Sequence, residues 1–224
     1  MKKLTALLLV VTILSGIFAG CKPDTADEPK VPIERHTITD AHNRQVEVPM
    51  KVESIVCVGV GALRYTCYMG AQDLVVGVED CEKEPVISRL YNYVNIEKFK
   101  NLPVIGTNGN PYPEEIIKLA PDVIVMSKSA SVDADDLQAK TGTPVVVVPG
   151  SDTTLDNDCF ETIRIMGQLY GKLDRANQLT GYLKGFGKEL QDRIADIPEE
   201  KKPSVYVGGV SYKGHHGFEG TEAG

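Results

Sequence analysis

The sequence predicts an α/β protein, with a lobe built on a parallel sheet and flanking helices, a long connecting helix and the beginning of a second α/β lobe. Three observations lead to this class. Short apolar runs alternate with helical segments between residues 54 and 150, which is typical of parallel strands that are covered on both faces. Apolar residues then recur every three or four positions from Phe160 to Ile197, as in amphipathic helices. A further strand-like run, SVYVGG, follows at residues 204–209.

The chain begins with the pattern of a secretory leader, expected over residues 1–20. Two lysines precede an apolar run that ends in the small residues Ala19 and Gly20, as in signal peptides. A permanent membrane span is the alternative, but a spanning helix needs about 20 apolar residues and this run is shorter. Residues 21–35 are rich in proline and charge, so we expect them to form a tether.

The motif FAGC at residues 18–21 resembles the lipobox of prokaryotic lipoproteins. The resemblance implies that the leader is removed before Cys21 and that this cysteine carries the lipid that anchors the protein to a membrane, outside the cytoplasm. One acyl chain alone binds a membrane only weakly, so two or three chains on Cys21 would provide the anchor. A plain cleaved leader is the alternative.

The first lobe is expected over residues 36–158. Apolar and polar residues alternate on both sides of a turn rich in His, Asn and Arg at residues 36–49, which predicts a hairpin. Short apolar runs predict buried strands at residues 54–59, 74–79, 102–106, 122–127 and 144–150. Helical spacing predicts helices at residues 62–71, 113–120 and 134–142, the last ending at Gly142. Strands separated by helices of about ten residues indicate a parallel sheet with right-handed crossovers.

Connecting helices are expected over residues 159–200. Gly171 and Asp174 are typical of a helix stop and a fresh N-cap, so a short helix precedes a long one over residues 175–197. The strand expected after them needs neighbours for its backbone groups, and no later segment of this sequence could supply them. Residues 201–224 are therefore expected to begin a second lobe, most of which is absent from this chain.

The composition argues against one class of partner and leaves the cysteines unassigned. A net charge of −7 and a pI near 5.2 argue against nucleic acid, because phosphate binding needs a concentrated basic face. Cys57, Cys67, Cys81 and Cys159 are scattered, without the Cys-x-x-Cys spacing of zinc or redox sites. We expect buried thiols, and a disulfide between Cys57 and Cys81 stays open. We expect no catalytic residues, metal site or cofactor.

A dinucleotide-binding oxidoreductase is the enzyme alternative. CVGVGALR at residues 57–64 follows a strand and opens a helix, with Glu79 or Asp80 after the next strand. This resembles a dinucleotide-binding unit, in which an acidic residue lies about 20 residues after the glycines. Arg64 stands at the position of the third glycine, however, where the helix and strand must pack closely. We therefore expect the protein not to be an enzyme.

With these elements in view, the chain resembles the substrate-binding proteins of ABC importers for ferric siderophores, haem and cobalamin. The segments that carry the resemblance are TITDAHNRQVEVP, SIVCVGVGALRY, LVVGVED, PVIGTNGNPYPEEIIKLAPDVIVMS and KTGTPVVVV. The resemblance implies two lobes joined by one long helix. It also implies that an iron chelate, haem or corrinoid binds between the lobes and is delivered to an ABC permease with its ATPase. A non-transport surface binding module is a further alternative.

The resemblance also implies that Glu114, on the outer rim of the first lobe, meets an arginine of the permease. Glu115 is the rival for this role. Both glutamates also suit the N-terminus of a helix, because a carboxylate there interacts favourably with the helix dipole.

Ligand-binding residues are expected beyond the carboxyl ends of the parallel strands, in the cleft that the resemblance implies. Arginine and lysine suit an anionic chelate or a propionate, and tyrosine offers a flat surface to a large ligand. The candidates are Arg64, Tyr65, Asn108, Ser127, Lys128, Ser151, Tyr212 and His215. His215 and His216 are adjacent, so in extended backbone they point to opposite sides and are not expected to bind one metal ion together.

Overall fold

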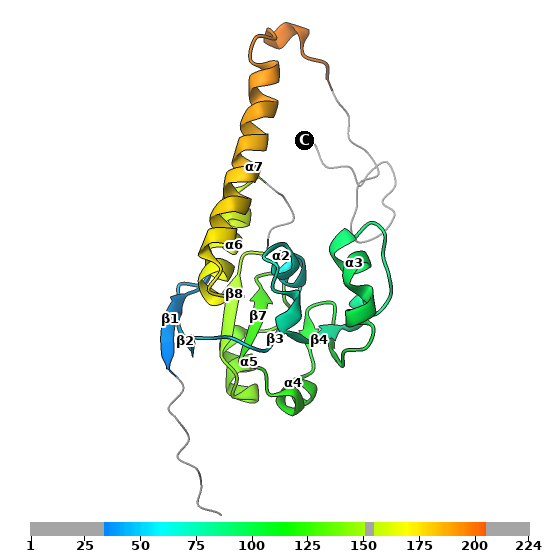
Figure 1. The fold of residues 1–224 in the computed structure, drawn as a ribbon, viewed down its shortest axis with the longest axis vertical. Helices are drawn as coiled ribbons and strands as arrows, with labels where there is room; N and C mark the ends of the chain where they lie inside the picture. The colour runs from blue at the N-terminus through cyan, green and yellow to red at the C-terminus, as the bar shows by residue number, and fades with distance from the viewer. Residues whose placement is uncertain (1–33, 151–154, 205–224) are drawn as a thin grey trace, which may run out of the picture. The chain divides into compact units, whose positions relative to one another are not determined.

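The computed structural model of this chain describes residues 34–150 and 155–204 (Figure 1). Several sequence predictions lie outside these residues: the leader, nearly all of the tether, the strand at residues 204–209 apart from its first residue, Cys21, Ser151, Tyr212 and His215. Of the helices in the described part of the chain, none combines the length and the apolar character needed to cross a membrane.

A six-stranded sheet is the central element of the fold (Figure 1). Its strands are β3 (Ile55–Val58), β4 (Val75–Glu79), β5 (Val104–Thr107), β6 (Asn110–Pro111), β7 (Val123–Ser127) and β8 (Val145–Val148). Across the sheet the order is β6-β5-β4-β3-β7-β8, and every neighbouring pair is parallel except β5 with β6. The predicted parallel sheet is confirmed, and each strand predicted for it is present.

Helices cover both faces of the sheet. They are α2 (Ala62–Tyr68), α4 (Pro113–Leu119), α5 (Ala134–Thr141) and α6 (Asn157–Leu169). On one face Cys57 of β3 belongs to the same buried cluster as Ile163 of α6, and α2 contributes to that cluster as well. On the other face Val58 of β3 shares a second buried cluster with Ile116 of α4 and with residues of α5. Because successive strand residues point to opposite faces, burial on both sides explains the continuous apolar runs.

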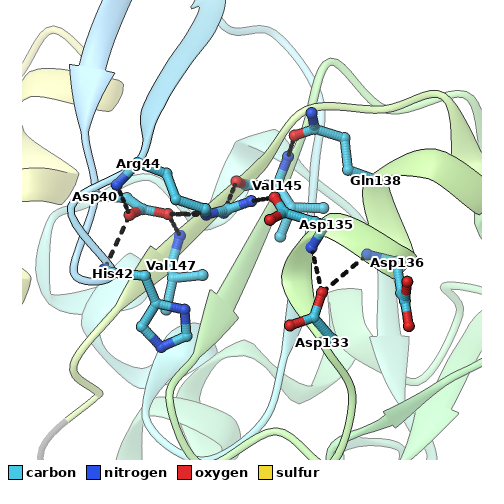
Figure 2. A network of polar contacts seen from close by, with 9 residues as sticks. All are labelled: Asp40, His42, Arg44, Asp133, Asp135, Asp136, Gln138, Val145 and Val147. Carbon is cyan, nitrogen blue, oxygen red and sulfur yellow. Dashed lines mark hydrogen bonds and ion pairs between the residues drawn. The ribbon is translucent and has the colours of Figure 1, made fainter.

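A two-stranded hairpin, β1 (Arg35–Thr39) with β2 (Gln45–Pro49), confirms the predicted hairpin. A buried ion pair fixes its turn to the sheet edge at β8 (Figure 2). Asp40 Oδ2 accepts from Arg44 Nη2 at 2.7 Å and from the backbone N–H of Val147 at 3.2 Å. Arg44 also donates to a backbone carbonyl of β8 at 2.6 Å. The hairpin turn thereby covers part of an edge strand that would otherwise expose unpaired backbone groups.

The helix α3 (Leu90–Phe99) is not predicted by the sequence. Its apolar residues do not form one buried face, because Leu90 and Val94 are 67% and 73% exposed while the polar Asn92 is fully buried. The polar side chain of Asn92 can be buried because its NH₂ group has an acceptor, Glu82 Oε2, at 2.8 Å. The spacing of apolar residues therefore carries little signal for this helix.

The long helix is α7 (Leu173–Ile194), which follows α6 after a break at Gly171. Gly171 has a φ of 62°, in the left-handed conformation that commonly ends helices. The N-cap prediction for Asp174 is wrong, because Lys172 is the N-cap and Asp174 lies in the first turn. A carboxylate in that turn still interacts favourably with the helix dipole. The short 3-10 helices are η1 (Gln72–Leu74), η2 (Asp80–Glu82) and η3 (Glu199–Lys201).

Candidate functional site

A cleft of about 1140 Å³ lies at the carboxyl ends of the parallel strands. Its lining residues are Cys57, Gly59, Val60, Gly61, Leu63, Arg64, Glu79, Cys81, Glu82, Ser88, Arg89, Tyr91, Asn108, Gly109, Ser129 and Ser131. Nearly all of them follow β3, β4, β5 or β7, whose carboxyl ends meet at one edge because these strands are parallel. The strand order reverses at β3, which neighbours both β4 and β7, and open α/β sheets bind ligands at such a point.

The loop after β3 contains glycines because its backbone adopts conformations that other residues avoid. Gly59 and Gly61 have φ angles of 84° and 88°, in the left-handed region. A Cβ on Gly61 would lie 2.9 Å from the carbonyl oxygen of Gly150, so this loop passes close to the segment that follows β8. The N–H of Val60 donates to Ser129 Oγ at 3.2 Å, which joins the loop to the one after β7.

Glu79, the last residue of β4, contributes a carboxylate to the cleft lining although it is only 8% exposed. Its Oε1 accepts from the N–H of Gly109 at 2.6 Å, and its Oε2 accepts from the N–H of Gly59 at 3.3 Å. Burial raises the pKa of Glu79, the two N–H groups lower it, and the nearby charges of Glu82 and Asp80 raise it. The net result is a pKa above the ordinary value of 4.5.

Glu82 is a second buried carboxylate of the cleft lining, and side chains satisfy it. Its Oε1 accepts from Arg89 Nη1 at 3.1 Å and from the Tyr91 hydroxyl at 2.7 Å, and its Oε2 accepts from Asn92. Arg89 also donates to the carbonyl of Cys81 at 2.9 Å. Burial and the Glu82 carboxylate raise the pKa of Tyr91 well above its ordinary value. This network fixes the segment between β4 and α3, and it holds Arg89 at the cleft.

Two arginines, Arg64 and Arg89, bring positive charge to the cleft. The Arg64 guanidinium lies over the ring of Tyr65, with its Cζ atom 5.1 Å from the ring centroid. Asn108 and three serines add amide and hydroxyl groups to the lining. Guanidinium groups suit planar anions such as carboxylates, so the two arginines offer contacts to an anionic group of a ligand, beside the carboxylates of Glu79 and Glu82 in the same lining. In the described part of the chain, no group of three or more His, Cys, Asp or Glu side chains is placed to hold a metal ion.

The structure brings two of the predicted ligand residues, Arg64 and Asn108, to the cleft. Lys128 is exposed and is not among the lining residues. Tyr65 and Ser127 are buried, with 2% and 0% of their surface exposed, and they are not among the lining residues. Ligand contact by any of these residues stays a prediction.

Sequence reasoning misses the segment between β4 and α3, which supplies Glu82, Ser88 and Arg89 to the cleft. Their position is the signal that could identify them. They follow the carboxyl end of a parallel strand, as the predicted ligand residues do, but Ser88 and Arg89 lie several residues beyond the end of β4.

The described cysteines are all free thiols, and the expected burial holds for Cys57 and Cys159 but not for Cys67 and Cys81, which are partly exposed. The disulfide between Cys57 and Cys81 that the sequence leaves open is therefore not formed. Burial raises the pKa of Cys57 and of Cys67 to about 12. Thiols of this kind remain protonated and unreactive at neutral pH.

Glu114 and Glu115 both lie in the first turn of α4. Glu115 forms an ion pair with Lys118 at 2.7 Å, whereas Glu114 is exposed. The docking role of Glu114 stays a prediction.

Comparison with known proteins finds relatives along most of the chain. A family model described as "Periplasmic binding protein" matches residues 57–217. The chain is also similar to the uncharacterized ABC transporter substrate-binding lipoprotein YvrC of Bacillus subtilis, with 24% identity over 213 residues. That alignment covers 92% of this chain and 64% of the relative.

Two solved structures have a similar fold. MolA, the molybdate periplasmic binding protein of Haemophilus influenzae, has a TM-score of 0.62 and 20% identity, covering 74% of this chain and 56% of that chain. SirA of Staphylococcus aureus, solved in complex with staphyloferrin B, has a TM-score of 0.54 and 25% identity, covering 72% of this chain and 52% of that chain. The chain therefore spans less than two thirds of the length of each of these proteins.

Proposed function

This chain belongs to the periplasmic binding protein family, and we propose on that premise that it is the solute-binding protein of an ABC importer. In this proposal the protein captures an iron chelate, or a related haem or corrinoid, outside the cytoplasm and delivers it to a permease with its ATPase. The name of the similar Bacillus subtilis lipoprotein, which refers to substrate binding for an ABC transporter, supports this class. The protein binds its solute and does not transform it.

The observation that carries the proposal is the cleft at the carboxyl ends of the strands, with Arg64 and Arg89 in its lining. Small-molecule sites commonly measure about 300–1000 Å³, so a cleft of about 1140 Å³ suits a large ligand. Iron chelates with carboxylate groups, and haem with its propionates, present anionic oxygens to a protein. A guanidinium binds such groups through paired, charge-assisted hydrogen bonds.

Two further residues are proposed to connect the protein to the membrane and to the permease. Lipid on Cys21 would keep the protein beside the permease, and Glu114 would meet the permease through an arginine. The ion pair between Glu115 and Lys118 favours Glu114 as the docking residue. Reversing the charge of Glu114 is expected to weaken delivery and to leave ligand affinity unchanged, because charge pairs of this kind mainly govern encounter and orientation.

Ligand identification tests the proposal directly. We expect mass spectrometry to find an iron chelate, haem or corrinoid that copurifies with the chain. We also expect the chain to bind one of ferric citrate, hemin or cyanocobalamin saturably when tyrosine fluorescence is followed. Arg64→Ala is expected to weaken that binding about tenfold, and Arg193→Ala on α7, which is not in the cleft, should leave it unchanged.

Failure of every probe to bind, or equal affinity in wild type and Arg64→Ala, would contradict the proposal. Uptake of the bound probe by cells that contain the permease distinguishes an importer from a non-transport surface binding module, which would bind the probe without uptake.

A further inference from the structure

Glu79 lies where one side chain can reach two loops of the cleft. It ends β4, and β4 lies between β3 and β5 in the sheet. The carboxylate uses both oxygens, one on the N–H of Gly59 after β3 and the other on the N–H of Gly109 after β5. Two loops that are far apart in the sequence therefore share one acceptor group.

Both loops pack closely against the end of β7 and the segment that follows it. Gly59 and Gly109 have φ angles of 84° and 78°, so other residues would be strained at both positions. A Cβ on Gly59 would lie 3.2 Å from Ser127 Cβ, and a Cβ on Gly109 would lie 3.3 Å from the Cα atom of Ala130. Because glycine has no side chain to fix it, the position of each loop depends on hydrogen bonds to its backbone.

We infer that Glu79 is a positioning residue for ligand binding, whose carboxylate holds the loops after β3 and β5 together and thereby sets where Arg64 and Asn108 meet the ligand. Asn108 directly precedes Gly109 and has a φ of 47°, a left-handed conformation that asparagine adopts more readily than most non-glycine residues. The inference rests on the proposed function because it assumes a ligand. The hydrogen bonds from Gly59 and Gly109 to Glu79 can be measured in the protein without a ligand.

The surroundings of Glu79 distinguish it from Glu82. The charged and titratable groups around it are Asp80, Glu82 and the Cys81 thiol on its own segment, the Cys57 thiol on β3, and Arg64 and Arg89 in the lining of the same cleft. Glu82 accepts from the side chains of Arg89, Tyr91 and Asn92, whereas Glu79 accepts from backbone N–H groups. Neutralising Glu79 therefore acts on the backbone of two loops, while neutralising Glu82 acts on an ion pair.

The test compares the wild type with Glu79→Gln. Glutamine keeps the shape of the side chain, but it turns an NH₂ group towards one of the two N–H donors. In proton–nitrogen correlation spectra at neutral pH, we expect the Gly109 amide proton to move upfield and its hydrogen exchange to quicken about tenfold. The Val125 amide in β7 should be unchanged. Asp73→Asn is the matched control, because the Asp73 side chain is 87% exposed and lies outside the cleft lining.

The second readout is affinity for ferric citrate, measured by tyrosine fluorescence. We expect Glu79→Gln to weaken binding about tenfold while the spectra show a folded protein. If Glu79→Gln does not fold, titration of the wild type decides the question, because the Gly59 and Gly109 amide resonances should both shift as the Glu79 carboxylate is protonated.

Different outcomes of these experiments would overturn different parts of the proposal. Unchanged Gly59 and Gly109 amides in Glu79→Gln would overturn the inference even if the wild type binds ferric citrate. Shifted amides with unchanged affinity would overturn the positioning role. If no probe binds the wild type, the proposed function fails, and the amide spectra alone then decide whether Glu79 holds the two loops.

Discussion

The hairpin turn and the cleft each contain a buried carboxylate, and the two carboxylates have different partners. Asp40 in the hairpin turn is 3% exposed and pairs with the guanidinium of Arg44 (Figure 2). It also accepts from the backbone N–H groups of His42, Arg44 and Val147. Glu79 is similarly buried, but it accepts from two glycine N–H groups and lines the cleft.

The two carboxylates differ in the groups that compensate their buried charge. An arginine beside Asp40 compensates the burial of charge, and the network that they form is not part of the cleft lining. The hydrogen bonds to the Glu79 carboxylate come from peptide N–H groups rather than from a cation, and the pKa of Glu79 is raised. We therefore expect changes at Asp40 to affect mainly the free energy of unfolding and changes at Glu79 to affect mainly ligand binding.

The largest effect is expected at the hairpin. Asp40→Ala should lower the free energy of unfolding by about 3 kcal/mol, because Arg44 loses its buried partner and three backbone N–H groups lose their acceptor. Urea denaturation measures this loss. Asp73→Ala, at a largely exposed side chain, should change the same quantity by about 0.5 kcal/mol or less. A loss below about 1 kcal/mol in Asp40→Ala would show that the hairpin network contributes little to stability.

A somewhat smaller effect on stability is expected within the cleft. Arg89→Ala should lower the free energy of unfolding by about 2 kcal/mol, since Glu82 keeps its bonds to Tyr91 and Asn92 but loses its cation. Ligand affinity should fall in the same variant. Arg89→Lys keeps the charge but cannot donate to both Glu82 and the Cys81 carbonyl in the same way, so only part of each loss should be recovered.

The pH dependence of stability tests how burial acts on Glu79. Burial raises the pKa of Glu79 above 4.5, despite the opposing N–H groups, so the folded state binds this proton more tightly than the unfolded state. The stability contributed by the Glu79 proton is therefore fully present below pH 4.5 and is lost as the pH rises through the folded pKa. The free energy of unfolding of wild type minus that of Glu79→Gln should fall over this interval. A rise would mean that the N–H groups outweigh burial.

The smallest effect is expected at the exposed end of the hairpin network. Arg44 Nη1 lies 2.6 Å from Asp135 Oδ1, but the Asp135 side chain is 75% exposed. Asp135→Asn should therefore change the free energy of unfolding by about 0.5 kcal/mol or less. A double-mutant cycle with Asp40→Ala would reveal any larger coupling between the two acids, which would contradict the assignment of stability to Asp40.

The elements that follow apolar periodicity could be predicted from the sequence. The strands are buried on both faces, so their runs are continuously apolar, and the hairpin alternates because it is buried on one side. The helix α3 could not be predicted in this way, since its buried Asn92 is polar and its Leu90 and Val94 are exposed. The cap at Lys172 could not be predicted either, because no side-chain hydrogen bond defines it.

The candidate site could be predicted only in part. The rule that ligands bind beyond the carboxyl ends of parallel strands selects the loops that contain Arg64 and Asn108, and both residues line the cleft. The rule does not indicate that Tyr65 and Ser127 turn into the protein interior. Nor does it indicate that Glu82 brings Arg89 to the cleft, because that contact depends on an ion pair across seven residues.

Mapping a bound ligand onto the backbone amides tests the central claim most directly. When gallium citrate, the diamagnetic analogue of ferric citrate, is added to the chain, we expect the proton–nitrogen resonances to shift in the loops after β3, β4, β5 and β7, with the largest shifts near Arg64, Arg89 and Gly109. The hairpin and α7 should be unaffected. Saturable shifts confined to α7 or to the hairpin, with the loops of the cleft unchanged, would contradict the account.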